Sequence, residues 1–427
     1  MTDEMSDDNG RFVLNILAAP MELQDGKVKT FLLDSVFLEA TNHSTVAQAV
    51  VSCVADYGIA FDMVIAVNTD NASYMRKAYT AVFKGLFPNS VHITCLAHIM
   101  NLLGEAFKQP FKQVNQFIKN MNAIFWNAGA RKYRFLHHLK SVKPSQKATM
   151  PPNPIGTRWI CWYDSVKYHL DHMEECKYSN FIESEMEHAR SLAPISLKEL
   201  SQFFAVEENV QNVKAHMKFI TEKSQSPMAT SVWSMLKSIE NAFNAGGVTM
   251  REMEKYCSED TPMAQKIENT DIFNQAYSLV ESKLRKYMAP EGQPGIEFLH
   301  HVQFFHPAKV IMVPPPNQLY GIPGLRLVPD QEIRRYMKDL GPAALKSSPT
   351  EAINIEHFWN SAFETVPNLV ACARRYIYAT VSSADAERSF SLYNIVLSER
   401  RRNLSESSLK QLVFLYYNNF VGKHFFE

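Results

Sequence analysis

Short apolar segments separated by turn residues fill the first part of the chain. Phe12–Leu17 and Val28–Leu33 are apolar runs in turn-rich surroundings, so each is predicted to be a strand, and their short connection favours an antiparallel hairpin. Apolar positions at helical spacing then follow Ser44, a plausible N-cap, and stop at Gly58. This pattern predicts an amphipathic helix.

Two further apolar segments follow this helix. Met63–Asn68 and Val91–Thr94 are short and largely apolar, as strands buried on both faces are. The order strand, strand, helix, strand, helix, strand predicts a mixed sheet with helices on its faces. Helical periodicity dominates from Leu102 to Ile311, and the prolines of Val313–Pro316 predict a linker before a final helical region.

Composition places the chain among globular proteins. Of its 427 residues 46% are apolar, and 15 Gly and 21 Pro are too few for a collagen-like or mostly disordered chain. No apolar run reaches the ~18–20 residues of a membrane span, and the acidic start does not resemble a signal peptide. We therefore expect an intracellular protein without a membrane segment. Its six scattered cysteines suggest neither a disulfide framework nor a zinc ribbon.

Charge is unevenly distributed along the chain. The 44 Lys and Arg balance the 44 Asp and Glu, but nine basic and no acidic residues lie between Phe107 and Lys147. Aromatic residues interleave with these cations, a mixture typical of nucleic-acid binding. A solvated helix face over an aromatic core is the alternative. The candidate DNA-binding cations are Lys108, Lys112, Lys119, Arg131, Lys132 and Arg134.

Two carboxylates fall at predicted strand ends. Asp70 closes the strand that follows the helix, and Asp3 precedes the hairpin, at the end of a strand that would lie upstream of the chain start. Side chains at carboxyl strand ends reach the crevice in which α/β proteins bind ligands. Paired carboxylates there suit Mg²⁺ and attack on a phosphodiester. From spacing alone, a helix N-cap is the commoner role for Asp70.

Cys95 and His98 have the spacing of metal ligands, but no second pair stands out to complete a zinc site. A buried thiol beside a histidine that packs or touches substrate is the preferred interpretation.

Several blocks along the chain match a known pattern in a fixed order. They are Thr2–Asp7, Val67–Met75 with an apolar strand ending in Asp70, Cys95–Leu102 with its C-x-x-H spacing, Thr157–Trp159, Phe358-Trp359, Pro367–Leu369, Ser382–Ser391 and Leu397–Leu404. These blocks resemble the hAT superfamily of DNA transposases and their domesticated relatives. The match is most specific in the C-terminal blocks.

The resemblance implies an α/β fold with an RNase H-like mixed sheet, interrupted by a large α-helical insertion and followed by an all-helical C-terminal region. The corresponding divisions are 1–104, 105–345 and 346–427, with the proline-rich linker near the end of the second.

The resemblance also assigns site residues. Asp3, Asp70 and Glu387 match the acidic residues that hold catalytic Mg²⁺ or Mn²⁺. His98, Arg158 and Trp159 match positions near the cleaved DNA end, where Trp159 would stack on an unpaired base. A core position beside Trp162 is the alternative for Trp159, and a salt bridge with Arg388 or Arg400 is the alternative for Glu387.

Self-association is a further implication of the resemblance. The apolar C-terminal residues assigned to dimerisation are Trp359, Phe390, Leu409, Leu412, Val413, Tyr416 and Phe420. Packing within the chain's own core is the alternative for them.

Two features depart from the family pattern. The strand that should hold Asp3 is expected to be absent from this chain, and no Cys/His finger of the BED type is found in it. The preferred interpretation is therefore a transposase-derived, DNA-associated, nuclear dimer with weak or no cleavage. The alternatives are an active Mg²⁺-dependent transposase in a truncated gene model, and a protein-interaction or transcription-regulating dimerisation module without catalysis.

Overall fold

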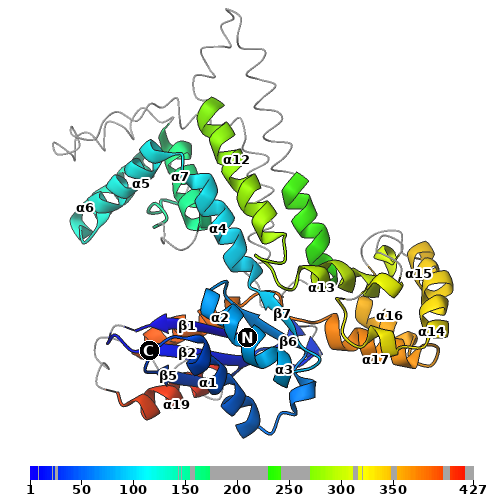
Figure 1. The fold of residues 1–427 in the computed structure, drawn as a ribbon. Helices are drawn as coiled ribbons and strands as arrows, with labels where there is room; N and C mark the ends of the chain where they lie inside the picture. Colours follow the sequence, from blue (N-terminus) through cyan, green and yellow to red (C-terminus); the bar gives the residue numbers. More distant parts are fainter. Residues whose placement is uncertain are drawn as a thin grey trace, which may run out of the picture. The chain divides into compact units, whose positions relative to one another are not determined.

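The chain divides into two compact units (Figure 1). Unit 1 comprises Met1–Ile99, Phe219–Lys237 and Lys286–Glu427, and unit 2 comprises Met100–Lys218 and Ser238–Arg285. The structure, a computed structural model, describes residues 1–7, 9–21, 23–24, 27–142, 144–145, 147–153, 159–173, 229–241, 270–310, 316–319, 321–347, 353–397 and 404–418. The predicted linker Val313–Pro316 lies outside them except for Pro316.

Unit 1 contains small sheets with both strand orientations. An antiparallel sheet has the order β1-β2-β5, formed by β1 (Thr2–Ser6), β2 (Phe12–Ala18) and β5 (Phe31–Leu38). β6 (Ala66–Thr69) and β7 (Val91–Thr94) pair in parallel, and β3 (Leu23–Gln24) and β4 (Lys27–Val28) form a short hairpin. The predicted mixed α/β class is confirmed.

The first strand is part of the sheet, so the expectation that it is absent from the chain is wrong. Thr2–Ser6 pairs with Phe12–Ile16, and Asp3 lies opposite Asn15. A tight turn joins the two strands, with Gly10 at a φ of 75° that favours glycine. Five residues before this turn are enough to form the strand, and Asp3 is the second of them.

Helix α1 (His43–Asp56) follows the antiparallel sheet. It begins one residue before the predicted N-cap Ser44, because the Asn42 side chain accepts hydrogen bonds from the backbone N–H groups of Ser44 and Thr45. The Thr45 hydroxyl in turn accepts the Asn42 N–H, which completes a capping box. Gly58, at a φ of 65°, follows the end of the helix as predicted.

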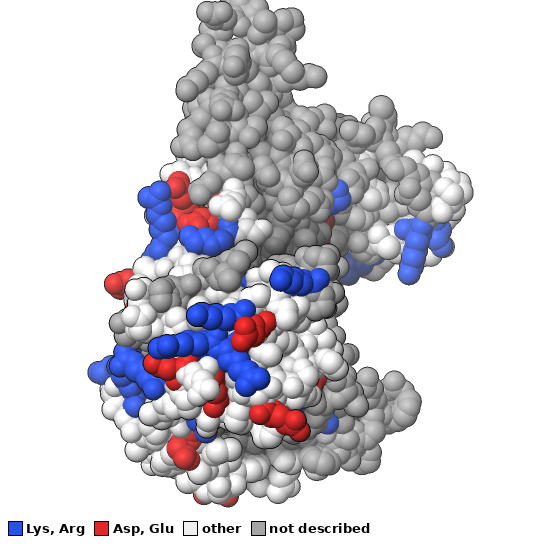
Figure 2. All heavy atoms as spheres, turned by 90° about the vertical axis from the view of Figure 1, so that its right-hand side faces the viewer, with Lys and Arg blue, Asp and Glu red and all other residues white. Residues whose placement is uncertain are grey.

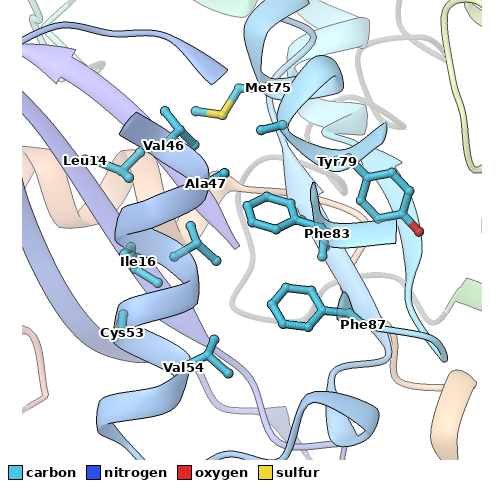
Figure 3. Close-up of a cluster of buried hydrophobic side chains, with 13 residues drawn as sticks. Leu14, Ile16, Val46, Ala47, Cys53, Val54, Met75, Tyr79, Phe83 and Phe87 are labelled. Carbon is cyan, nitrogen blue, oxygen red and sulfur yellow. The ribbon is translucent and has the colours of Figure 1, made fainter. Parts of the chain in front are cut away.

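A hydrophobic core joins this helix to the sheet and to the next helical segment. That segment consists of α2 (Ser73–Ala78), a π-helical turn (Tyr79–Phe83) and α3 (Lys84–Leu86). Figure 3 shows Met75 and Phe83 of this segment, and Phe87 directly after it, pointing toward the side chains of β2 and α1. The cluster also includes Leu14, Ile16, Val46, Ala47, Cys53, Val54 and Tyr79. The core fixes the segment that follows Asp70.

Two buried amide side chains pair with outer strands. Gln293 accepts a hydrogen bond from the Thr94 N–H and donates one to the Thr94 carbonyl, both at 2.8 Å. Asn418 does the same with Leu32, at 3.0 and 2.9 Å. Each amide therefore satisfies both backbone groups of one strand residue, as a neighbouring strand would.

The rest of unit 1 is helical where the structure describes it. Its helices are α13 (Ile296–His301), α14 (Asp330–Arg335), α15 (Gly341–Ser347), α16 (Ile355–Ser361), α17 (Pro367–Tyr376), α18 (Ala384–Val396) and α19 (Glu406–Tyr417). Single turns of other helix types lie at Val302–Phe305, Pro307–Lys309, Pro316–Gln318, Leu325–Leu327 and Tyr336–Leu340.

The described residues of unit 2 contain helices and no strand. Helices α5 (Lys112–Phe125), α6 (Gly129–Val142) and α7 (Trp159–Met173) lie within it, and the unit boundaries fall inside α4 (Leu96–Lys108), α12 (Thr270–Tyr287) and a helix at 229–241. The predicted helical region from Leu102 onward is thus confirmed over these residues.

Candidate functional site

Three acidic side chains from separate elements of unit 1 act on one another. Asp3 lies in β1, Asp70 directly follows β6, and Glu387 lies in the first turn of α18. Burial, together with the charges of Asp70 and Glu387, raises the pKa of Asp3 to about 8. Burial is the larger cause, but the repulsion from Asp70 and Glu387 acts only over short distances. The structure therefore brings the three predicted catalytic residues into one neighbourhood.

The chemistry of this set suits a hard divalent cation. Carboxylate oxygens are the ligands that Mg²⁺ prefers, and a cation would relieve the repulsion that raises the pKa of Asp3. Among the described residues, however, no group of three or more His, Cys, Asp or Glu side chains is arranged to hold a metal ion. The donor types therefore fit Mg²⁺ or Mn²⁺, and the side chains would have to move closer to bind it.

Asp70 is held in a local turn before α2. Its Oδ1 atom accepts a hydrogen bond from the Ala72 N–H at 3.0 Å. The N-cap of α2 is Ala72 itself, so the alternative role of Asp70 as a helix N-cap is wrong. Burial raises the pKa of Asp70, whereas the Ala72 N–H and the charge of His98 lower it. His98, a predicted DNA-contacting residue, therefore lies near this carboxylate.

The segment before α18 is tied to the ends of the parallel strands. Asn68 donates a side-chain hydrogen bond to the Thr380 carbonyl at 2.9 Å, and the Leu96 N–H donates to the Val381 carbonyl at 3.0 Å. The Ser383 N–H donates to Cys95 Sγ at 3.2 Å. These contacts place the first turn of α18, with Glu387, beside the strand ends.

Cys95 has a structural role in the C-x-x-H block. Its side chain is completely buried, and Sγ accepts hydrogen bonds from the N–H groups of both Ser383 and His98. Burial raises the pKa of the Cys95 thiol, which keeps it neutral. The expectation of a buried thiol beside a histidine is confirmed, and the thiol also contacts the start of α18.

A buried polar chain anchors the middle of α18. Asn15, on β2 opposite Asp3, donates to Ser389 Oγ at 2.6 Å and accepts from Ser35 Oγ at 2.7 Å. Asn15 and Ser389 are completely buried, so losing these bonds would be costly. The strand of Asp3 and the helix of Glu387 are therefore fixed to the same asparagine, a residue that sequence spacing did not identify.

Arg388, one of the two alternative salt-bridge partners of Glu387, forms an ion pair with Asp385. Arg400 lies outside the described residues.

Glu4, the residue after Asp3, is a further acidic residue that the sequence analysis did not single out. It accepts a hydrogen bond from the Tyr74 hydroxyl, which links β1 to the first turn of α2.

The predicted DNA-binding cations of unit 2 fall into two groups. Lys112, Lys119, Lys132 and Arg134 are exposed. Lys108 forms an ion pair with Glu105 at 3.2 Å, and Arg131 donates to the Ile124 carbonyl at 2.5 Å. Arg158 and the side chain of Trp159 lie outside what the structure describes, so their predicted roles stay predictions.

The aromatic residues of the same segment also divide. Phe107, Phe111, Phe125 and Phe135 are buried, as the core alternative predicts, whereas Trp126 is 72% and Tyr133 71% exposed. On the face shown in Figure 2, acidic and basic side chains lie interspersed among the described residues. The core alternative is thus confirmed for these four phenylalanines, and nucleic-acid binding by the exposed side chains of the segment stays a prediction.

The structure favours core packing for most residues assigned to dimerisation. Trp359 is completely buried and donates its indole N–H to the Phe305 carbonyl at 3.0 Å. Phe390, Leu409 and Val413 are buried against apolar residues of β2 and β5. Leu412 and Tyr416 are half-buried, and Phe420 lies outside the described residues.

Residues 332–419 match the family model described as the hAT family C-terminal dimerisation region. The matched segment is about a fifth of the chain; it begins in α14, includes Glu387 and extends past α19. It supports hAT family membership and self-association. No curated protein matches the chain. Within the described residues, no helix has the length and apolarity needed to cross a membrane.

Proposed function

We propose that this chain is a hAT transposase-related, self-associating protein that binds DNA. We further propose that it cleaves a phosphodiester bond of the DNA, with Asp3, Asp70 and Glu387 as its catalytic residues. The observation that carries the proposal is the raised pKa of Asp3, which the charges of Asp70 and Glu387 help to cause. Titratable side chains with strongly shifted pKa values are concentrated at functional sites, and the family-model match over residues 332–419, which includes Glu387, supports the same assignment.

The strand arrangement supports an RNase H-like core. A three-stranded antiparallel sheet precedes α1, and two parallel strands joined by a helical crossover follow it. The carboxylates come from the first strand, the end of the next strand after α1, and a late helix. Unit 2 interrupts unit 1 in the sequence and is helical where described. This order agrees with a helical insertion into such a core.

The residues have distinct proposed roles. Asp3, Asp70 and Glu387 would hold Mg²⁺ or Mn²⁺, which would supply charge neutralisation at the attacked phosphate and activate a water or hydroxyl nucleophile. His98 lies close enough to influence Asp70 and would contact the DNA end. Arg158 and Trp159 would contact the same end. Because DNA would be the substrate, we also propose a nuclear location.

The proposal is tested by nicking of a supercoiled plasmid with and without Mg²⁺. Asp70→Asn and Glu387→Gln should each lower the rate by about 100-fold or more, because displaced ligands cost that much in catalytic geometry. Asp330→Asn is the matched control, since Asp330 is an exposed carboxylate at the start of α14. Mg²⁺-dependent nicking that survives both site substitutions would contradict the assignment.

A DNA-associated dimer without cleavage is the second candidate. It is favoured by the arrangement of the described carboxylates, which do not form a ready metal site. It predicts DNA binding and a dimer by light scattering, but no nicking at any Mg²⁺ concentration. A dimer that binds neither duplex nor single-stranded DNA would instead indicate a protein-interaction module.

A further inference from the structure

Two large aromatic side chains of unit 2 lie on the surface within eight residues of each other. Trp126 is the C-cap of α5 and Tyr133 lies in the second turn of α6. They are 72% and 71% exposed, whereas the next most exposed tyrosine or tryptophan among the described residues, Tyr57, is 49% exposed. Aromatic rings usually contribute to stability by being buried. These two exposed rings therefore contribute little to the free energy of unfolding.

The local backbone and core hold these rings in place. The Trp126 N–H donates to the Asn122 carbonyl at 3.0 Å, and Asn127 then adopts a left-handed φ of 50°, which ends the helix. Beneath α6, Phe135 and Leu139 pack with Phe125 of α5 in one buried cluster. The exposed side chains are therefore mounted on packed helices rather than on a loose loop.

The exposed face of α6 carries a second ring and several cations. His137 follows Tyr133 by one helical turn, and their ring centroids are 6.4 Å apart. Lys132 and Lys140 are exposed on the same helix. No acidic residue lies between Phe107 and Lys147. This segment would therefore attract a polyanion more strongly than a protein surface on which acidic and basic residues are mixed.

We infer that Trp126 and the exposed face of α6, defined by Lys132, Tyr133, His137 and Lys140, bind single-stranded DNA. The lysines would contact phosphates, and the rings would stack on unpaired bases. A duplex offers its phosphates to the lysines but keeps its base faces stacked inside, so it gains nothing from the rings. The inference deepens the proposed function by naming an unpaired strand as the ligand of this surface.

The test compares fluorescein-labelled oligothymidine with a duplex of equal length, bound to the full chain in EDTA. The double variant Trp126→Ala/Tyr133→Ala should bind the single strand about tenfold or more weakly per lost ring and bind the duplex nearly as well as the parent. Tyr133→Phe, which retains the ring, should bind the single strand like the parent. Phe363→Ala, which removes an exposed aromatic beside Arg374 in unit 1, is the matched control.

Unchanged single-strand affinity in the double variant, or an equal loss for duplex and single strand, would overturn the inference. Thermal unfolding of each variant should match the parent, because the substituted side chains are exposed. Failure here is distinguishable from failure of the proposed cleavage. Binding is measured without divalent cations, and the double variant retains Asp3, Asp70 and Glu387, so its Mg²⁺-dependent nicking can be measured separately.

Discussion

The acidic residues of unit 1 and the basic helices of unit 2 differ in how the protein holds them. Asp3 and Glu387 belong to elements joined by completely buried hydrogen bonds through Asn15, whereas Lys112 and Lys132 lie on exposed helix faces. Phosphoester chemistry requires carboxylates placed to within about half an ångström. Attraction of a polyanion requires charge density and tolerates movement. The elements that carry the acidic residues are therefore joined by buried hydrogen bonds, whereas the cations of unit 2 lie on helix surfaces.

The largest contrast is expected between two tryptophans. Trp359→Ala should lower the free energy of unfolding by about 3–5 kcal/mol, because it removes a completely buried ring packed near Phe305 and Tyr336. Trp126→Ala should change it by less than about 0.5 kcal/mol, because that ring is exposed. Urea unfolding followed by circular dichroism measures both. If Trp359→Ala left stability intact and only dissociated a dimer, Trp359 would belong to an interface instead.

An intermediate effect is expected at the polar chain. Asn15→Ala leaves the buried hydroxyls of Ser35 and Ser389 without this partner, and should cost about 1–3 kcal/mol of unfolding free energy. It should also reduce Mg²⁺-dependent nicking, since α18 loses an anchor near Glu387. Ser391→Ala is the control, because Ser391 is exposed on the same helix. Equal nicking by both variants would show that the chain does not position the site.

The smallest effect concerns one buried histidine in each unit. Burial lowers the pKa of His92 to about 4 and that of His169 to about 3, with Arg76 and His172 contributing respectively. Both rings stay neutral when folded but gain protons more readily when unfolded. Their contribution to stability is therefore complete above an unfolded pKa near 6.5 and is lost as pH falls toward the folded value.

When the pH falls from 7 to 5.5, the lowered pKa of each of these histidines should reduce the free energy of unfolding by about 1 kcal/mol. His92→Gln and His169→Gln should each reduce the acid sensitivity, measured by urea unfolding at the two pH values. Ser391→Ala, at an exposed position that carries no titratable group, should leave it unchanged. An identical pH response in all three variants would show that other groups cause the acid sensitivity.

Periodicity predicted the elements whose apolar residues face a core. Val91–Thr94 is observed with the predicted bounds, and β2 differs from its prediction by one residue. The strand predicted to end at Leu33 instead continues to Leu38. Its polar residue Ser35 is buried and donates to Asn15, so a hydrogen bond across strands compensates for a residue that interrupts the apolar pattern.

The candidate site was predictable in its residue types but not in its supports. Asp70 and Glu387 could be identified from their motifs, whereas the link between Cys95 and Ser383 joins residues nearly three hundred positions apart. Strand formation at Asp3 also escaped prediction, because Thr2–Ser6 is mostly polar and depends on its pairing with β2. Such contacts arise only when distant segments meet.

The paired amides Gln293 and Asn418 have a consequence for assembly. An unpaired strand edge is a template on which another chain can add a strand. At Thr94 and Leu32 that template is already filled by a side chain of the same molecule. Two copies could not extend a continuous sheet through these positions without first expelling the amides. Strand addition at these two positions of β5 and β7 is therefore blocked in the folded protein, which removes one route to strand-by-strand aggregation there.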